Sequence, residues 1–220
     1  MPLFEVPQFK EEEREKKLSA KYGEKKASRM MKLLYNVLSL KDLVYTLFVK
    51  AEIYMGKNLD TVKPRMIWSC PETLLAKFSA EFGWLGKQLA SYFSGDTDFY
   101  YCSGATPDDV GKFGAYMAGL PYLYESDVSN WDGSLAAIML QVERYFLENN
   151  VVGMPEDFKF LMEHWGINTG ESKDKKVKVK IPYGRRSGDL WTSMFNSMLN
   201  ILIVKFVTQA KRRVAYDLHG

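Results

Sequence analysis

One stretch, residues 125–134, constrains the fold more than any other part of this 220-residue chain. Apolar and aromatic residues at 121–124 precede it and predict a short strand, whereas apolar residues recur at helical spacing after it. We therefore expect Asp127 where the strand ends and Asp132 where the helix begins. Side chains at such turns project into a cleft more readily than into a core. Two carboxylates five residues apart can then face one pocket in different roles.

The composition is that of a folded protein, with 46% hydrophobic and 26% charged residues. A net charge of +3 indicates no polyanionic partner by itself, but lysines and arginines cluster at 173–186 and 211–213. Two cysteines and two histidines, widely scattered, argue against a structural zinc site and a disulfide scaffold. The N-terminus has no signal-peptide pattern, and no apolar run approaches the ~20 residues that span a bilayer.

Several segments have predictable local structure. The mixed-charge run 10–26 predicts an exposed helix, and Ser28 is a candidate cap for the helix that follows. Pro64 favours an extended conformation before it, so 62–67 is expected to be a strand or extended arm carrying Lys63 and Arg65. A surface edge strand with incidental charges is the competing interpretation.

Later helices have clear start signals. Thr106 as cap, Pro107 and two acidic residues in the first turn predict a helix start, which explains the adjacent aspartates without a metal. A helix is expected from Ser134 to about Glu148. Another is expected to open at Pro155 and to close near Gly166.

The segment 176–181 alternates strictly, with Lys176, Lys178 and Lys180 on one face and apolar residues on the other. This pattern predicts a half-buried strand with a row of ammonium groups facing outward. An edge strand protected by lysines is the alternative. A long helix is expected to begin near Gly188, and its Thr192 and Asn196, four residues apart, share one face.

Three stretches, in chain order, resemble the RNA-dependent RNA polymerases of positive-strand RNA viruses, most closely the tombusvirus and nodavirus-like groups. Residues 127–132 (Asp-Val-Ser-Asn-Trp-Asp) match that family's motif A, and Ser187-Gly188 with Thr192 and Asn196 match motif B. Residues 63–67, with 48–52 upstream, resemble the basic motif F. The resemblance covers roughly residues 45–205.

The resemblance implies a partial right-hand polymerase of the α+β class, comprising the fingers and part of the palm. It would be helix-rich with short antiparallel strands. The implied division assigns 1–121 to the fingers, 122–148 to the palm, 149–186 to a fingers insertion and 187–220 to the palm. The implied activity is RNA-directed RNA synthesis by a two-metal mechanism that uses Mg²⁺ or Mn²⁺.

The resemblance also implies roles for individual residues. Asp127 and the Val128 carbonyl would bind the metal ions, and Asp132 and Asn196 would bond each other and sense the ribose 2′-hydroxyl. Together, Asp127, Asp132 and Asn196 form the implied catalytic set. The nucleotide would be bound by a larger set: Lys50, Lys63, Arg65, Asp132, Ser187, Gly188, Thr192 and Asn196. From their clustered positive charge, and not from the resemblance, the residues expected to bind RNA are Lys176, Lys178, Lys180, Arg185 and Arg186.

One expected motif is missing. The family's Gly-Asp-Asp hairpin does not follow motif B, and the sequence ends at Gly220. We therefore expect a polymerase fragment whose partners are RNA, nucleoside triphosphates and the remaining palm and thumb of the same polyprotein or replicase. Residues 1–220 alone are not expected to extend RNA. The expected location is the host cytoplasm, at membrane-associated replication complexes.

Three alternatives remain at the level of sequence. A reverse transcriptase shares the palm, but it needs a bulky residue to block the 2′-hydroxyl, whereas Asp132 offers an acceptor. A non-catalytic RNA-binding module could use the lysine row at 176–180 with Arg185 and Arg186, although only Tyr183 is nearby for base stacking. An ordinary α+β interaction domain with chance motifs is the third.

Overall fold

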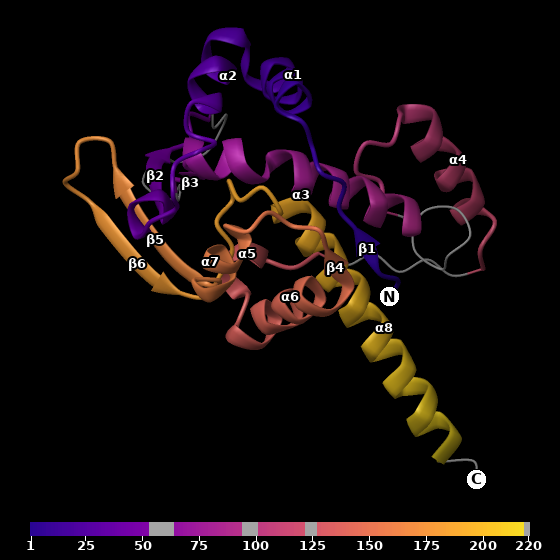
Figure 1. Cartoon of the computed structure of the whole chain (residues 1–220). Helices are drawn as coiled ribbons and strands as arrows, with labels where there is room; N and C mark the ends of the chain where they lie inside the picture. Colours follow the sequence, from indigo (N-terminus) through magenta and orange to yellow (C-terminus); the bar gives the residue numbers. More distant parts are fainter. Residues whose placement is uncertain (53–63, 94–100, 122–126, 218–220) are drawn as a thin grey trace. The chain divides into compact units, whose positions relative to one another are not determined.

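The computed structural model describes residues 1–52, 64–93, 101–121 and 127–217 (Figure 1). They fall into two compact units: residues 1–83 with 130–192, and residues 84–129 with 193–220. Two helices, α3 (Glu72–Tyr92) and α8 (Thr192–Asp217), contribute residues to both. The sheets and the segments that carry Arg65, Asp132 and Ser187 all belong to the first unit.

The first unit contains a four-stranded sheet in the order β3-β2-β5-β6. Its strands are β2 (Val44–Val49), β3 (Met66–Ser69), β5 (Ile167–Ser172) and β6 (Lys178–Pro182). The β2–β3 and β5–β6 pairs are antiparallel, whereas β2 and β5 pair in parallel across more than a hundred residues of chain. The α+β polymerase fold class is confirmed, and the sheet is mixed rather than wholly antiparallel.

Gly170 allows the side chains of two neighbouring strands to pack closely over β5. A Cβ at Gly170, in β5, would lie 2.7 Å from both Leu47 Cδ2 and Trp68 Cζ3. Any larger side chain would push these two core residues away, and both are almost fully buried. The strands β3, β2 and β5 therefore share one packed face around position 170.

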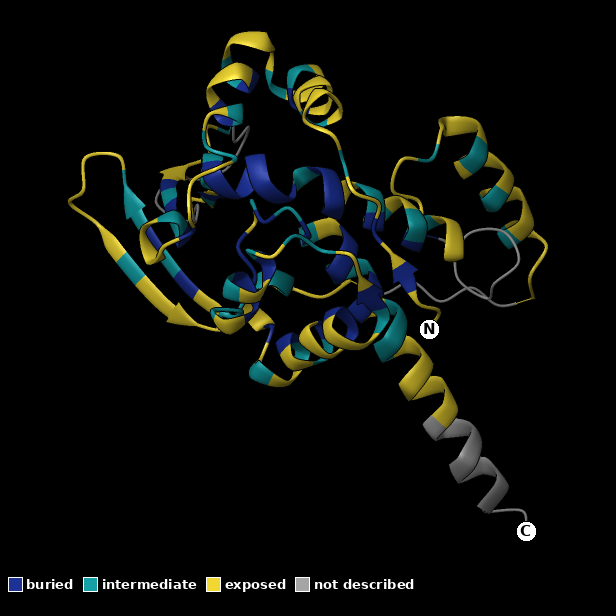
Figure 2. Cartoon of the chain, viewed as in Figure 1, coloured by how far each residue is buried: buried dark blue, intermediate teal, exposed yellow. Residues whose placement is uncertain are grey.

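The aromatic core of this unit forms around the first half of α3. Phe78 and Phe82 each make an edge contact with Phe158 at 6.1 Å between ring centroids. Phe82 also packs 4.9 Å from Trp191, which stacks on Trp165 at 4.5 Å. Figure 2 shows that this half of α3 is almost continuously buried. Its side chains are therefore covered on all faces of the helix.

The N-terminal segment of the first unit differs from expectation. The predicted helix over 10–26 is divided at Gly23 (φ 82°) into α1 (Glu11–Tyr22) and α2 (Glu24–Met31), and Ser28 lies inside α2 instead of capping a helix. A left-handed glycine ends one helix and redirects the chain. The Ser28 cap was therefore a wrong prediction. A short helical turn, η1 (Leu40–Leu43), leads into β2.

The segment after Asn130 is also broken where one helix was expected. It forms a short turn of helix, α5 (Trp131–Ser134), followed by α6 (Ala137–Asn150), because Leu135 is extended (ψ 109°) and buried between them. After α6, β4 (Val151–Val152) pairs in parallel with β1 (Phe4–Glu5). The helix expected to open at Pro155 begins later, as α7 (Phe158–Glu163).

In the second unit, α4 (Pro107–Ala118) starts as predicted. Thr106 Oγ1 accepts from the Asp109 backbone N–H at 3.2 Å, and the Asp109 carboxylate accepts from the Thr106 backbone N–H at 3.0 Å. The adjacent aspartates are thus confirmed as a helix start. The long C-terminal helix was also predicted, although α8 begins at Thr192 rather than near Gly188.

Two further observations complete the fold. The strand expected at 121–124 lies almost wholly outside the described residues, as does Lys63. Within the described ranges, no helix is both long and apolar enough to cross a membrane. The division into fingers and palm that the sequence implied stays a prediction.

Candidate functional site

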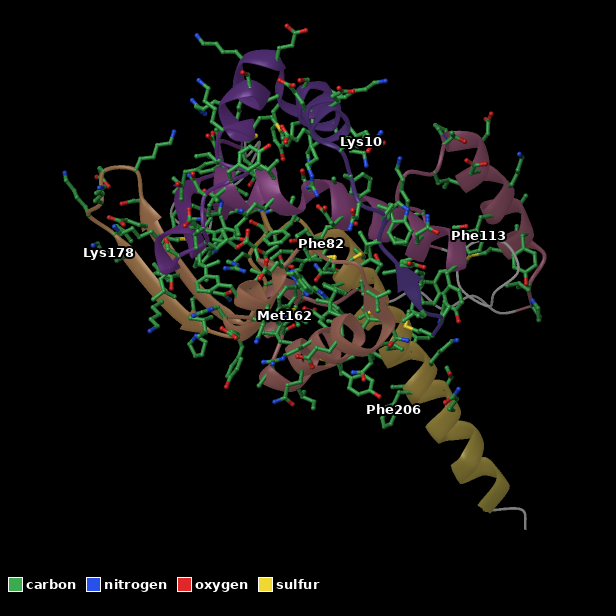
Figure 3. The ribbon with its side chains drawn as sticks, viewed as in Figure 1. Lys10, Phe82, Phe113, Met162, Lys178 and Phe206 are labelled. Carbon is green, nitrogen blue, oxygen red and sulfur yellow. The ribbon has the colours of Figure 1, made fainter. Side chains whose placement is uncertain are left out.

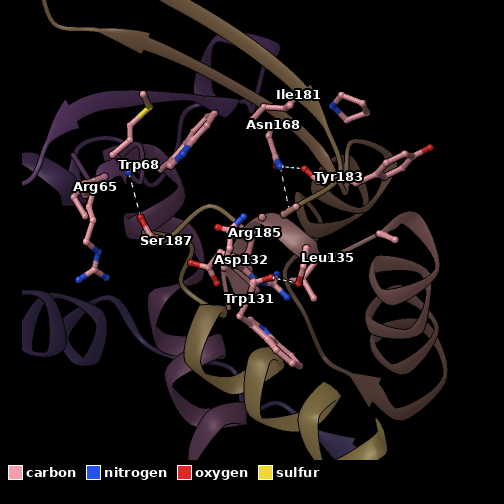
Figure 4. Close-up of a pocket in the computed structure, with 18 of the residues that line it drawn as sticks. Arg65, Trp68, Trp131, Asp132, Leu135, Asn168, Ile181, Tyr183, Arg185 and Ser187 are labelled. Carbon is pink, nitrogen blue, oxygen red and sulfur yellow. Dashed lines mark hydrogen bonds between the residues drawn. The ribbon is translucent and has the colours of Figure 1, made fainter. Parts of the chain in front are cut away.

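A pocket of about 910 Å³ opens within the first unit (Figure 4). It is lined by four stretches from distant parts of the chain: residues 64–68, residues 130–136, Asn168, and residues 181–187 except Arg186. Arg65, Asp132 and Ser187 are among the lining residues, so the structure brings one residue of each predicted motif to one cavity. This convergence is what the sequence could suggest only by resemblance.

Arg65, which lines the pocket, belongs to a charged group where the end of β2 meets the start of β3. Glu52 bridges the two strand ends, since its Oε1 lies 2.8 Å from Lys50 Nζ and accepts from Arg65 Nη1 at 3.2 Å. The Lys50 backbone N–H also donates to the Arg65 carbonyl at 2.9 Å. Both cations remain substantially exposed. They are therefore held in place yet accessible to an anion.

Asp132 reaches the pocket from the first turn of α5. The turn begins at Asn130, which takes a left-handed conformation (φ 55°). The Asn130 side chain folds over Gly133, since a Cβ there would lie 2.5 Å from it and the side chain would have to move for any larger residue. Asp132 is half-buried, and its backbone carbonyl accepts from the Arg185 N–H at 2.7 Å. The same hydrogen bond ties motif A to the segment that precedes motif B.

The motif B residues Ser187 and Gly188 form the corner of a turn. The Asp189 N–H donates to the Arg186 carbonyl at 3.0 Å, and the Thr192 hydroxyl donates to the same carbonyl at 2.9 Å. Ser187 Oγ accepts from the Trp68 N–H of β3 at 3.3 Å. A Cβ at Gly188 would lie 1.8 Å from the Trp68 carbonyl, so only glycine fits against this strand.

Asn168 supports the next part of the pocket wall. Its Nδ2 donates to the carbonyls of Tyr183 and Gly184, the latter at 3.1 Å (Figure 4). Gly184 has a φ of 80°, and its N–H donates to the Leu135 carbonyl at 2.9 Å. Residues 183–185 are thus bonded to β5 on one side and to the 132–135 turn on the other.

Arg185 and Arg186 are buried, which argues against the predicted direct contact with RNA. The side chain of Arg185 is 1% exposed and forms a bidentate pair with Glu143, which is fully buried in α6 and also accepts from Trp165 Nε1. Arg186 Nε lies 2.9 Å from Asp189 Oδ1, although the contact is too poorly aligned for a hydrogen bond. Both guanidinium groups are committed inside the protein.

The predicted lysines, in contrast, are all exposed. Lys178 and Lys180 lie on β6, the outermost described strand of the sheet, and Lys176 precedes it (Figure 3). Lys178 is 3.8 Å from Glu171 and Lys176 is 3.9 Å from Asp174, both loose pairs. The opposite face is less buried than predicted, because Val177 and Ile181 are half exposed and only Val179 is partly covered.

Three of the remaining predicted residues, Asp127, Val128 and Asn196, belong to the second unit. Asp127 and Val128 are exposed, and Asn196 is half-buried in α8. Thr192 stands at the end of the first unit and is half-buried. The predicted bond between Asp132 and Asn196 joins residues of different units and stays a prediction.

Sequence reasoning missed the residues that hold the motif B turn. Tyr45, Glu143 and Asp189 contribute buried polar side chains to it, although they come from a strand, a helix and a turn. Only Asp189 gave a local signal, since it stands three residues after Arg186. The other two partners are more than forty residues away from the arginines that they support.

Asp127 and the Val128 carbonyl are the candidate ligands for the implied magnesium. An exposed carboxylate such as Asp127, beside a backbone carbonyl, suits a cation that prefers oxygen ligands and keeps several waters. Across the described residues, no three His, Cys, Asp or Glu side chains gather into a group that could hold a metal ion. Asp127 and Val128 therefore fit as part of a magnesium site, without completing one.

Comparison with known proteins settles the family. The family model for viral RNA-dependent RNA polymerase matches residues 8–219, nearly the whole sequence. The chain belongs to this family. The matched range contains the three pocket residues Arg65, Asp132 and Ser187.

Relatives and a solved structure agree with this assignment. The genome polyprotein of Mengo encephalomyocarditis virus is 29% identical over 189 residues, covering 81% of this chain and 8% of the polyprotein. That of Theiler's murine encephalomyelitis virus (strain GDVII) is 26% identical over 174 residues, covering 74% and 7%. The sicinivirus 3Dpol RNA-dependent RNA polymerase matches with a TM-score of 0.56 at 20% identity, over 80% of this chain and 36% of that one. The chain thus spans a minor part of each relative.

Proposed function

We propose that this polymerase-family chain provides the fingers and part of the palm of a viral RNA-directed RNA polymerase, which transfers nucleotides on an RNA template. The observation that carries the proposal is the pocket lined by Arg65, Asp132 and Ser187. It combines an exposed cation, a carboxylate and a hydroxyl, which are the groups needed to bind a nucleoside triphosphate at its phosphates and its sugar.

Arg65 and Lys50 would bind the triphosphate. Both are exposed and share the single carboxylate of Glu52, so the local charge at the ends of β2 and β3 is positive. A triphosphate offers more negative charge than Glu52 and can recruit both cations through charge-assisted hydrogen bonds. Lys63 is proposed for the same role from its sequence position.

Asp132 would recognise the ribose. It is half-buried in the pocket wall, where its carboxylate can accept a hydrogen bond from a sugar hydroxyl. We propose that Asn196, with Thr192 beside it, donates to Asp132 and leaves one carboxylate oxygen for the 2′-hydroxyl. Ser187 and Gly188 would shape the floor beneath the nascent base pair.

Asp127, together with the Val128 carbonyl, would hold Mg²⁺ or Mn²⁺ in the complete enzyme. The bound cations supply activation of the 3′-hydroxyl and neutralisation of the leaving pyrophosphate. The exposed position of Asp127 leaves its carboxylate accessible for this role.

Lys176, Lys178 and Lys180 would contact the RNA backbone. They are exposed on one strand, and phosphate contacts of this kind position RNA without reading its sequence. Arg185 and Arg186 take no direct part in this proposal, because their buried pairs with Glu143 and Asp189 occupy them.

The proposal extends to the setting that the sequence suggested. The fingers would comprise 1–121 and the insertion 149–186, and the palm segments 122–148 and 187–220. The partners would be RNA template and product, nucleoside triphosphates and the remaining palm and thumb. The site of action would be membrane-associated replication complexes in the host cytoplasm. The kinship with tombusvirus and nodavirus-like enzymes stays a prediction, since the relatives named above are other viruses.

A binding module without catalysis is the second candidate, favoured by the exposed lysine strand alone. The two differ in what Asp127 does. If the chain only binds RNA, Asp127→Ala leaves its function intact, whereas a polymerase loses all synthesis.

The test is extension of an RNA primer by the polymerase that contains these 220 residues. Asp127→Ala should abolish incorporation of both ribonucleotides and deoxyribonucleotides. Asn196→Ala should lower the use of ribonucleotides about ten- to a hundredfold, as expected for ~1–3 kcal/mol of lost recognition, and affect deoxyribonucleotides much less. An unchanged ribose preference would contradict the assignment of Asn196, and Asp127-independent synthesis would contradict the proposed function.

A further inference from the structure

A buried polar cluster lies directly behind the motif B turn, in the first unit. Tyr45 projects from β2, and its hydroxyl donates to Asp189 Oδ1 at 2.5 Å. The guanidinium of Arg186 lies 4.0 Å from the centre of the Tyr45 ring and pairs with the same Asp189 oxygen. All three residues are at least 91% buried, so the cluster is closed to water.

The cluster clamps the two ends of the turn to each other. Arg186 and Asp189 flank Ser187 and Gly188, and they are joined twice, by the Asp189 N–H to Arg186 carbonyl bond and by their side-chain pair. Burial raises the pKa of the Tyr45 hydroxyl well above its usual value, so the hydroxyl stays protonated and able to donate. The turn is therefore anchored to β2 through Asp189.

The corner of the turn also packs directly against β3. The outward-facing N–H of Trp68 donates to Ser187 Oγ, and the Trp68 carbonyl leaves no room for a Cβ at Gly188. Lys50 directly follows β2 and Arg65 directly precedes β3, so the same pair of strands carries these two cations and the support of the motif B turn.

We infer that Tyr45, Arg186 and Asp189 are positioning residues, which lock the Ser187–Gly188 turn onto β3 and so fix its distance from Arg65 across the pocket. None of the three cluster residues lines the cavity, so the cluster can affect the pocket only through the turn that it holds. Its consequence for nucleotide binding rests on the proposed function, whereas the locking of the turn does not.

Tyr45→Phe tests the lock directly, because it removes one hydroxyl and keeps the ring under Arg186. Amide hydrogen exchange of the 220-residue chain, read by NMR, should become at least tenfold faster at Trp68 and Asp189, with the amides of α3 unchanged. Tyr101→Phe is the matched control: Tyr101 is also buried and its hydroxyl contacts Ser193 at 3.2 Å, so this variant should leave Trp68 and Asp189 as they are. Unchanged exchange at both amides, or a uniform rise throughout the first unit, would overturn the inference.

A kinetic arm then separates positioning from simple stabilisation. In the polymerase that contains this chain, Tyr45→Phe should raise the KM for nucleoside triphosphate about tenfold and change kcat less than about twofold. Asp189→Asn keeps an acceptor for Tyr45 but loses the charge that holds Arg186, and it should show the same split. A fall in kcat at constant KM would overturn the positioning role. Inactivity of the unaltered enzyme would count against the proposed function, and the exchange result would still decide the lock.

Discussion

Two groups of cations lie within eleven residues of sequence, yet the structure puts them in opposite environments. Lys176, Lys178 and Lys180 extend from an outer strand into solvent, whereas Arg185 and Arg186 are buried with carboxylates. In Figure 2, β6 is largely exposed. A basic stretch in a sequence can thus contain one part that is exposed to solvent and another that is buried in ion pairs.

The difference follows from what each side chain can reach. Arginine presents several donors in a planar fork that matches a carboxylate, so Arg185 can satisfy its charge inside the protein with Glu143. The lysines of β6 have only loose, exposed neighbours. Such pairs contribute little to stability and leave the ammonium groups available to phosphates.

The largest expected effect that tests this comparison is on stability. Arg185→Met should lower the free energy of unfolding by ~3–5 kcal/mol, because Glu143 is left buried without its partner. Urea unfolding of the chain measures it. Lys178→Met, on the exposed strand, should change the same quantity by less than ~0.5 kcal/mol. Equal effects of the two substitutions would erase the distinction.

A second test compares two cysteines, one beside the buried cluster and one exposed. Burial raises the pKa of Cys70 from 9.0 to about 12, and its Sγ lies 3.6 Å from the Tyr45 hydroxyl. This reduces the thiolate fraction about a thousandfold, and burial also blocks access. Iodoacetamide at neutral pH should therefore modify Cys102 and reach Cys70 only when the chain unfolds. Rapid labelling of both in the folded chain would show that the region behind the motif B turn is open.

The smallest effect is expected on RNA binding. Replacing Lys176, Lys178 and Lys180 by alanine should weaken binding of single-stranded RNA about tenfold at moderate salt. If each lysine contacts one phosphate, the slope of the logarithm of the binding constant against the logarithm of salt concentration should become shallower by about 2. Filter binding at several salt concentrations measures the slope. The same slope in both proteins would make the lysines edge protection rather than RNA contacts.

The parts predicted well from the sequence are those with local signals. The start of α4 depends on Thr106, Pro107 and Asp109, all within four residues, and the structure confirms it. The order of the motif-like stretches along the chain likewise indicated the polymerase fold, through its resemblance to a known family. The helix start can be predicted from the sequence because its physical causes lie within one turn of helix.

The parts predicted poorly depend on distant partners. The parallel pairing of β2 with β5, the bond of Tyr45 to Asp189, 144 residues away, and the burial of Arg185 against Glu143 have no local signature. Charge alone predicted that Arg185 and Arg186 face RNA. Only the positions of Glu143 and Asp189 in the fold show that this charge is neutralised inside.

The central claim is that the pocket lined by Arg65, Asp132 and Ser187 binds a nucleoside triphosphate. Photo-crosslinking of the 220-residue chain with an azido-substituted ATP, followed by mass spectrometry of the labelled peptides, tests it most directly. We predict labelling within 64–68, 130–136 and 181–187, suppressed by excess ATP and reduced in Arg65→Ala. Labelling confined to the exposed lysines of 173–180, and unaffected by Arg65→Ala, would contradict the account.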